Sequence, residues 1–189
     1  METEVHREDQ EYIALLGTAP TVNDYSTTLL LAVHNAAVID DKPYDFIMSL
    51  QVGDGRVVAM NSAGEPILMG KALSGSHAGQ VVPLTADWVR EPAELQKLTQ
   101  VTSGQFKALM VMTDGVSDIY FPHKTEMQHL YSDLIEKGII GDSSGHGETK
   151  EGDDSGKPDV ILRDWLDTYE VRGEFDDRTL VVLYRELAQ

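Results

Sequence analysis

The sequence predicts an α+β fold in which helices are segregated onto antiparallel β-sheets. Strand-like segments fill most of the first two thirds, two helical patterns follow, and a final strand closes the chain. A doubly wound parallel sheet would alternate strand and helix more regularly. The composition, with 41% hydrophobic and 25% charged residues, is that of a soluble globular protein. The 189 residues suffice for one domain with a core, or for a large piece of a bigger one.

The first half of the chain is predicted to be mainly β-structure. Residues 27–39 are apolar and partly β-branched, which indicates a buried strand, and residues 40–43 form a turn. Apolar residues alternate along residues 46–52, and a second strand spans 56–60 after a Gly-Asp-Gly turn. We expect these two strands to form a β-hairpin, and a short strand at 66–69 to extend it into a meander.

The second half contains two helical patterns between two strongly apolar strands. Residues 83–98 predict a loop and a helix, and residues 107–112 predict a central strand buried on both faces. Apolar residues recur at helical spacing behind Thr125, a candidate N-cap, and again from Pro158 onward. Residues 179–184 predict the last strand.

One segment interrupts an otherwise continuous domain. Residues 141–157 consist mainly of glycine, serine and acidic residues and contain no apolar side chain. Such a segment cannot bury a core, so we expect a mobile acidic surface insertion. Residues 1–189 are otherwise expected to form a single domain, or the C-terminal portion of one.

The charge and the missing cysteine limit the classes of partner. The chain carries 32 acidic residues against 15 Lys and Arg, a formal net charge of -17, which repels nucleic acids and anionic membranes. Without cysteine, any metal must be held by oxygen or imidazole. The N-terminus lacks a signal-peptide pattern and no apolar run is long enough for a membrane span, so we expect a cytoplasmic location.

Two aspartates stand at the ends of predicted strands. Asp114 follows the central strand and precedes a glycine, and Asp176 comes just before the last strand. If these strands are antiparallel neighbours, both carboxylates meet at one end of a sheet. Carboxylates without thiols select hard cations such as Mg²⁺ or Mn²⁺. The alternative is that an Asp-Gly pair after a strand is simply a turn.

Four motifs together resemble the type-2C metal-dependent protein phosphatase family, in its bacterial variety. Residues 109–118 read Leu-Met-Val-Met-Thr-Asp-Gly-Val-Ser-Asp, which is similar to the family's apolar strand followed by Thr-Asp-Gly. Residues 176–182 resemble its Asp-Asn-x-Thr strand, with Asp177 in place of the Asn. Gly-Asp-Gly-Arg at 53–56 resembles the Gly-Asp-Ser-Arg turn, and Ser-Thr-Thr at 26–28 resembles the Gly-Thr-Thr opening.

The resemblance implies both a fold and a function. The family's fold is a β-sandwich of two antiparallel sheets flanked by helices, and its metals bridge a hydroxide that attacks a phosphoserine or phosphothreonine. The match places metal ligands at Asp114 and Asp176, and more weakly at Asp87, after a Leu-Thr pair, for a further metal. The implied partners are a phosphorylated signalling protein and a cognate kinase. Asp118 is interpreted as a structural acid close to a helix.

The departures from the family pattern define the rival hypothesis. The early Arg-x-x-x-Glu-Asp segment and the Asp-Gly-x-Gly-Gly segment, which supply the phosphate-binding Arg and the bridging metal ligand, are absent. We therefore expect a partial domain that is a poor catalyst alone, with exposed strand edges able to pair with another chain. The alternative is a noncatalytic pseudophosphatase module that binds a phosphoprotein or a partner kinase. An acidic structural domain with chance motif matches is the third hypothesis.

Overall fold

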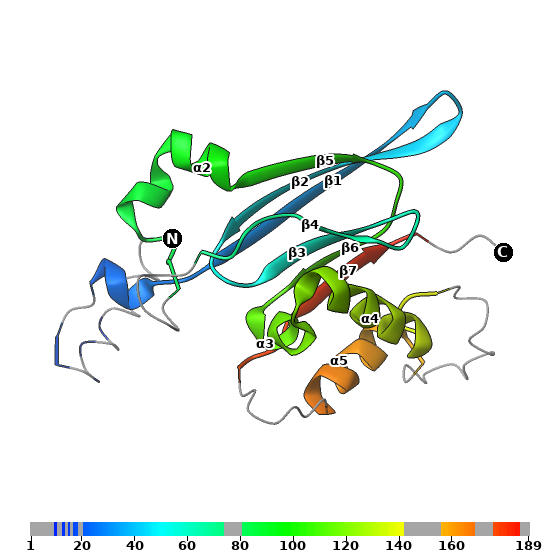
Figure 1. The fold of residues 1–189 in the computed structure, drawn as a ribbon. Coiled ribbons are helices and arrows are strands. Elements are labelled where there is room, and N and C mark those ends of the chain that lie inside the picture. The colour runs from blue at the N-terminus through cyan, green and yellow to red at the C-terminus, as the bar shows by residue number, and fades with distance from the viewer. Residues whose placement is uncertain are drawn as a thin grey trace.

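Two antiparallel sheets lie one above the other, with helices below one of them (Figure 1). The computed structural model describes residues 10, 13, 15, 17–18, 21–73, 81–141, 156–168 and 176–185. One sheet has three strands in the order β1 (Leu29–Ile39), β2 (Lys42–Val52) and β5 (Thr99–Gly104). The other has four, in the order β4 (Pro66–Leu68), β3 (Arg56–Asn61), β6 (Phe106–Met112) and β7 (Leu180–Tyr184). The predicted α+β class with antiparallel sheets is confirmed.

The hairpin in the first half joins different strands from those expected. β1 and β2 pair along their whole length around Asp40 and Asp41, whose φ angles of 51° and 60° suit a tight hairpin turn. The expected hairpin between residues 46–52 and 56–60 is wrong, because β2 and β3 belong to different sheets. The Gly-Asp-Gly turn therefore carries the chain from one sheet to the other.

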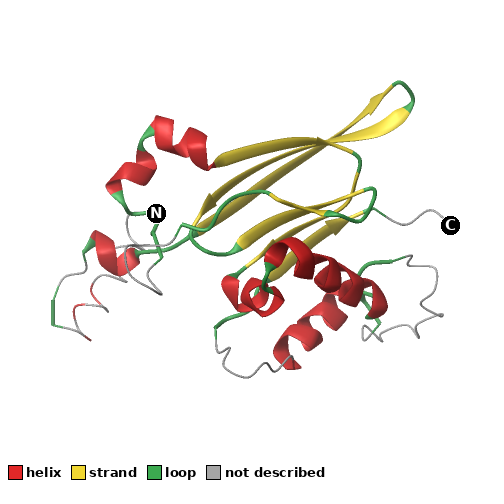
Figure 2. Ribbon diagram, in the orientation of Figure 1, coloured by secondary structure: helices red, strands yellow, loops and turns green. Residues whose placement is uncertain are grey.

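The two longest helices cover the outer face of the four-stranded sheet, whereas a shorter helix lies at the end of the three-stranded sheet (Figure 2). The two long ones are α4 (His123–Glu136) and α5 (Pro158–Thr168), so both predicted helices are confirmed, although α4 begins before Thr125. Where these helices pack against the sheet, the central strand β6 buries Met110 and Met112 almost completely. The shorter helical elements are η1 (Val22–Tyr25), η2 (Asp87–Arg90), α2 (Pro92–Leu98), α3 (Asp114–Ser117) and η3 (Asp118–Tyr120).

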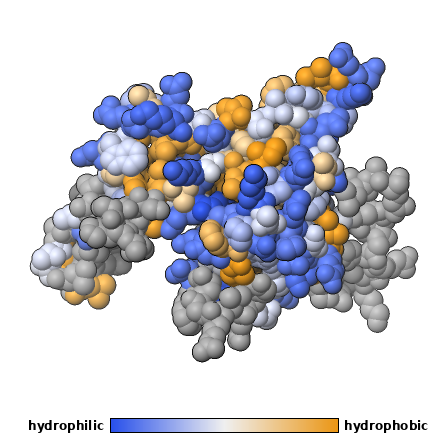
Figure 3. Space-filling model, viewed as in Figure 1, coloured by the Kyte–Doolittle hydropathy of each residue, from blue (hydrophilic) through white to orange (hydrophobic). Residues whose placement is uncertain are grey.

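The three-stranded sheet has one packed face and one open face. Its inner face joins a core between the sheets that contains Ile47, Phe106 and Leu109. On its outer face, Leu31 and Val33 of β1 are 43% and 46% exposed, and no residue of β1 is buried. The strand within residues 27–39 is therefore confirmed, but its predicted burial is wrong. Figure 3 shows hydrophobic surface in the upper half of the view, where this sheet lies.

Four further features concern the predictions. Strand β5 was not expected, because the residues Thr-Gln-Val-Thr-Ser-Gly carry a single apolar side chain. Pro92 begins helix α2, as its fixed φ angle allows. Residues 142–155 of the expected insertion lie outside the described residues. Within the part of the chain that is described, no helix is long and apolar enough to cross a membrane.

Candidate functional site

Asp114 lies where the central strand β6 ends and helix α3 begins. Thr113 is the N-cap of that helix, and Asp114 accepts a hydrogen bond at Oδ1 from the amide of Gly115 at 2.9 Å. Gly115, Val116 and Ser117 are buried, whereas Asp114 is only partly buried. The Asp114 carboxylate therefore extends from a rigid, packed corner at one end of the sandwich.

The segment that carries Asp176 lies directly against this corner. Strands β6 and β7 pair antiparallel, and beyond them the amide of Thr113 donates to the carbonyl of Thr179 at 3.1 Å. Thr113 Oγ1 accepts from the amide of Thr179 at 2.9 Å and donates to the carbonyl of Asp177 at 3.0 Å. The two strands are therefore antiparallel neighbours, which is the condition set in the sequence analysis, and their pairing brings the backbone of the two aspartate segments side by side.

Gly115 shows how close this approach is. A Cβ atom at Gly115 would lie 2.7 Å from the carbonyl oxygen of Asp177 and 2.9 Å from that of Asp176. Both contacts are with backbone, which cannot turn away as a flexible side chain could. A glycine is therefore required after Asp114 for the second aspartate segment to reach the site.

The Gly-Asp-Gly turn supplies a third acidic group at the same end. A Cβ atom at Gly55 would lie 2.6 Å from the carbonyl of Met112, so this turn packs against the last residue of β6. Buried Gln51 donates from Nε2 to the carbonyls of Gly55 at 2.7 Å and Gly53 at 3.3 Å. These bonds fix the turn that presents Asp54.

Arg56 closes the turn from the other side. Its guanidinium donates to the carbonyl of Asp54 at 2.8 Å and to that of Gly55 at 3.0 Å. Burial lowers the pKa of Arg56, while the charges of Asp118 and Asp54 oppose that shift. Arg56 thus neutralises part of the acidic charge at this end and holds the backbone that carries it.

The acids at this end repel one another. The pKa of Asp54 is raised, first by burial and then by the negative charges of Asp114 and Asp118. The pKa of nearby His123 is lowered by burial and by the charge of Arg56, which leaves the imidazole neutral near pH 7. Acids that repel one another in this way are stabilised when a cation binds near them.

Asp87 belongs to a different segment, the one that precedes helix α2. It begins η2, is exposed, and follows a segment tied to the start of β1 through the amide of Leu84 and the carbonyl of Thr27 at 2.7 Å. Among the described residues, no three His, Asp or Glu side chains are grouped closely enough to hold a metal ion. Asp114 and the Asp176 segment come together, but Asp87 does not complete a three-ligand set with them.

The comparisons with known proteins identify the family. The family model described as protein phosphatase 2C matches residues 2–137, which is more than half of the chain. This chain belongs to the protein phosphatase 2C family. The solved phosphatase domain of the cell fate determinant SpoIIE from Bacillus subtilis, Mn presoaked, is similar over all of this chain and 67% of that one, with 14% identity and a TM-score of 0.36. Among curated proteins, none matches the chain.

Two acids of this phosphatase 2C chain were not predicted as part of the site. Asp54 was noted only for its turn motif, and Asp118 was interpreted as a structural acid. Asp118 follows Asp114 by four positions across a short helical segment, a spacing that places side chains on the same face. That spacing could have identified Asp118, whereas the approach of Asp54 depends on the crossing between sheets, which the sequence did not predict.

Proposed function

We propose that this chain is a metal-dependent protein serine/threonine phosphatase domain that hydrolyses phosphomonoesters with Mg²⁺ or Mn²⁺. Asp114 and Asp176 are the proposed metal ligands, and Asp87 is a further ligand recruited when metal binds. The observation that carries this proposal is the contact of Gly115 with the backbone of Asp176 and Asp177, which brings two acidic segments to one corner. Family membership supplies the reaction class.

The donor groups at this end suit a hard divalent cation. The chain has no cysteine, and the groups that meet near Asp114 are carboxylates, which Mg²⁺ and Mn²⁺ prefer. Burial raises the pKa of Asp54, and the negative charges of Asp114 and Asp118 raise it further. A cation would neutralise that negative charge, which supports the proposal. Asp54 and Asp118 therefore join the proposed acidic cluster beside Asp114.

The protein's own contribution is to hold and orient these carboxylates. When bound, the cation supplies Lewis-acid stabilisation of the phosphoryl oxygens and eases the ionisation of water. Asp114 is oriented by the amide of Gly115, and Asp54 is presented by a turn that Gln51 holds from the core. Hydrogen bonds between Thr113 and Thr179 keep the Asp176 segment in place before any ligand binds.

The proposed substrate is a phosphoserine or phosphothreonine protein, and a cognate kinase is the proposed partner in signalling. We further propose that residues 1–189 act as one domain or as the C-terminal portion of one, with 141–157 as a surface insertion. The motifs with the phosphate-binding Arg and the bridging acid are absent from the 189 residues. Efficient turnover is therefore expected only when a polypeptide carrying these motifs is also present.

Manganese-dependent hydrolysis of a phosphothreonine peptide tests this proposal. The chain is assayed alone and mixed with a polypeptide that carries the two absent motifs, with and without Mn²⁺. The variant Asp114→Asn should lower the Mn²⁺-dependent rate by about 100-fold or more, since it removes a charge aimed at the reaction centre. The control Asp159→Asn removes an exposed carboxylate from α5 and should leave the rate unchanged. Equal rates for the two variants would refute the role of Asp114.

A further inference from the structure

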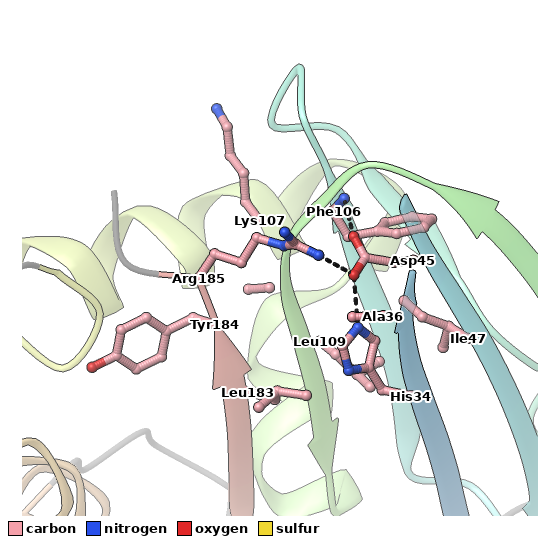
Figure 4. Close-up of a pocket in the computed structure, with 11 residues that line it drawn as sticks. His34, Ala36, Asp45, Ile47, Phe106, Lys107, Leu109, Leu183, Tyr184 and Arg185 are labelled. Carbon is pink, nitrogen blue, oxygen red and sulfur yellow. Dashed lines mark hydrogen bonds and ion pairs between the residues drawn. The ribbon is translucent and has the colours of Figure 1, made fainter. Parts of the chain in front are cut away.

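A second polar cluster lies at the opposite end of the sandwich, centred on Asp45. Phe106 begins strand β6, whereas Asp114 follows its last residue, so the two clusters are a full strand apart. Asp45 is 1% exposed and accepts three hydrogen bonds, from His34 Nε2 at 2.7 Å, from the amide of Phe106 at 3.0 Å and from the guanidinium of Arg185. Figure 4 shows these groups meeting between the two sheets.

The strand register explains why these residues meet. Ala36 pairs with Asp45, and His34 pairs with Ile47, so all four side chains point to the inner face of the three-stranded sheet. Arg185 follows β7 in the other sheet, where its amide donates to the carbonyl of Lys107 at 3.0 Å. The Asp45 cluster thus ties β1 and β2 to the end of β7.

A cavity of about 240 Å³ opens beside this cluster. Its walls are mainly apolar and include Ala36, Ile47, Leu109 and Leu183, with the Asp45 cluster forming the polar side. Pockets for drug-sized ligands begin at roughly 300 Å³, so this cavity suits a smaller molecule. The walls favour a ligand with a compact apolar body.

The charges at the cavity decide which polar group the ligand carries. Asp45 is buried and already accepts from three donors, so it offers little to a cation. Arg185 has five N–H donors. Among the described residues, its guanidinium donates to Asp45. Its side chain is 41% exposed, which leaves donors for an anion at the cavity. Lys107 extends away from Asp45 (Figure 4), so its ammonium is a distant charge.

We propose that this cavity binds a small organic carboxylate with an apolar body, such as an aromatic acid. The carboxylate pairs with the free donors of Arg185, and the body packs against Leu109, Leu183 and Ile47. Inorganic phosphate would leave the apolar walls unused, and a protein segment would exceed the volume. The site is independent of the proposed metal chemistry, because no residue of the Asp114 corner lines it.

A titration of the full chain with sodium benzoate tests the proposal. Binding is followed by nuclear magnetic resonance through the methyl groups of Ile47, Leu109 and Leu183, with neutral benzamide as the matched ligand. Benzoate should shift these methyls and should bind about tenfold more tightly than benzamide, which cannot form the ion pair. Equal affinity for the two ligands, or no shift with benzoate, would overturn the proposal.

Two variants separate the ion pair from general charge. Arg185→Gln should weaken benzoate binding about tenfold and leave benzamide binding unchanged, whereas Lys107→Gln should change neither affinity. An equal loss in both variants would overturn the role of Arg185. If Arg185→Gln does not fold by circular dichroism, Ala36→Leu takes its place, since it fills the cavity and keeps its charges. Benzoate binding that survives Ala36→Leu would also overturn the proposal.

Discussion

Asp45 and Asp54 belong to the same stretch of chain, the first within β2 and the second just after it, yet their surroundings differ. Burial would raise the pKa of Asp45, but hydrogen bonds from His34, the amide of Phe106 and Arg185 lower it overall. Burial raises the pKa of Asp54, and the charges of Asp114 and Asp118 raise it further. Hydrogen-bond donors hold the Asp45 carboxylate, whereas two neighbouring acids act against the ionised form of Asp54.

This difference in surroundings distinguishes an aspartate that stabilises the fold from one that is suited to bind a ligand. A carboxylate whose acceptor positions are filled by the protein stabilises the fold and needs no ligand. A carboxylate that faces other carboxylates destabilises the empty site and is relieved by a cation. The two ends of the sandwich can therefore be distinguished by substitutions whose effects on stability have opposite signs.

Gly115→Ala should give the largest loss of stability among these substitutions. The new Cβ would meet the backbone carbonyls of Asp176 and Asp177 at under 3 Å, so the free energy of unfolding should fall by about 2–3 kcal/mol. Urea unfolding measures the change. Gly141→Ala is the control, because nothing lies within 4 Å of its Cβ position. If both variants unfold alike, the close packing at Gly115 is not required.

Asp45→Asn should have the next largest effect. It removes the charge that His34 and Arg185 contact, so the free energy of unfolding should fall by about 1–2 kcal/mol at pH 7. A lowered pKa contributes stability that is present above the unfolded value and lost as pH falls through the folded value. The difference from the wild type should therefore shrink as pH falls below 3.8, as thermal unfolding across pH can measure. A difference that grows towards acid pH would contradict this account.

Asp54→Asn should produce the smallest change, with the opposite sign. A raised pKa means that ionised Asp54 destabilises the metal-free fold, so at pH 7 the variant should be about 0.5 kcal/mol more stable than the wild type. The advantage should disappear below pH 3.8, where both states of the wild type are protonated. Saturating Mn²⁺ should reverse the order of melting temperatures. If the metal-free Asp54→Asn variant is instead less stable than the wild type, Asp54 is a structural acid, as Asp45 is.

The sequence predicted features that depend on local pattern and missed those that depend on distant pairing. The strand β6 ending before Asp114 and the last strand β7 were predicted, because both are continuous apolar runs, whereas their antiparallel pairing was only a condition of the metal-site hypothesis. The partner of β2 was not, since a Gly-Asp-Gly turn fits either a hairpin or a crossing between sheets. The contact of Asp45 with Arg185 joins residues 140 positions apart, and no local pattern encodes it.

Calorimetric titration of the chain with Mn²⁺ tests the central claim, that the end of the sandwich at Asp114 holds a divalent cation. The wild type and the control Asp159→Asn should both take up Mn²⁺, and Asp114→Asn should bind it at least about tenfold more weakly. The same affinity in Asp114→Asn as in the wild type, or no Mn²⁺ uptake by the wild type, would contradict the claim.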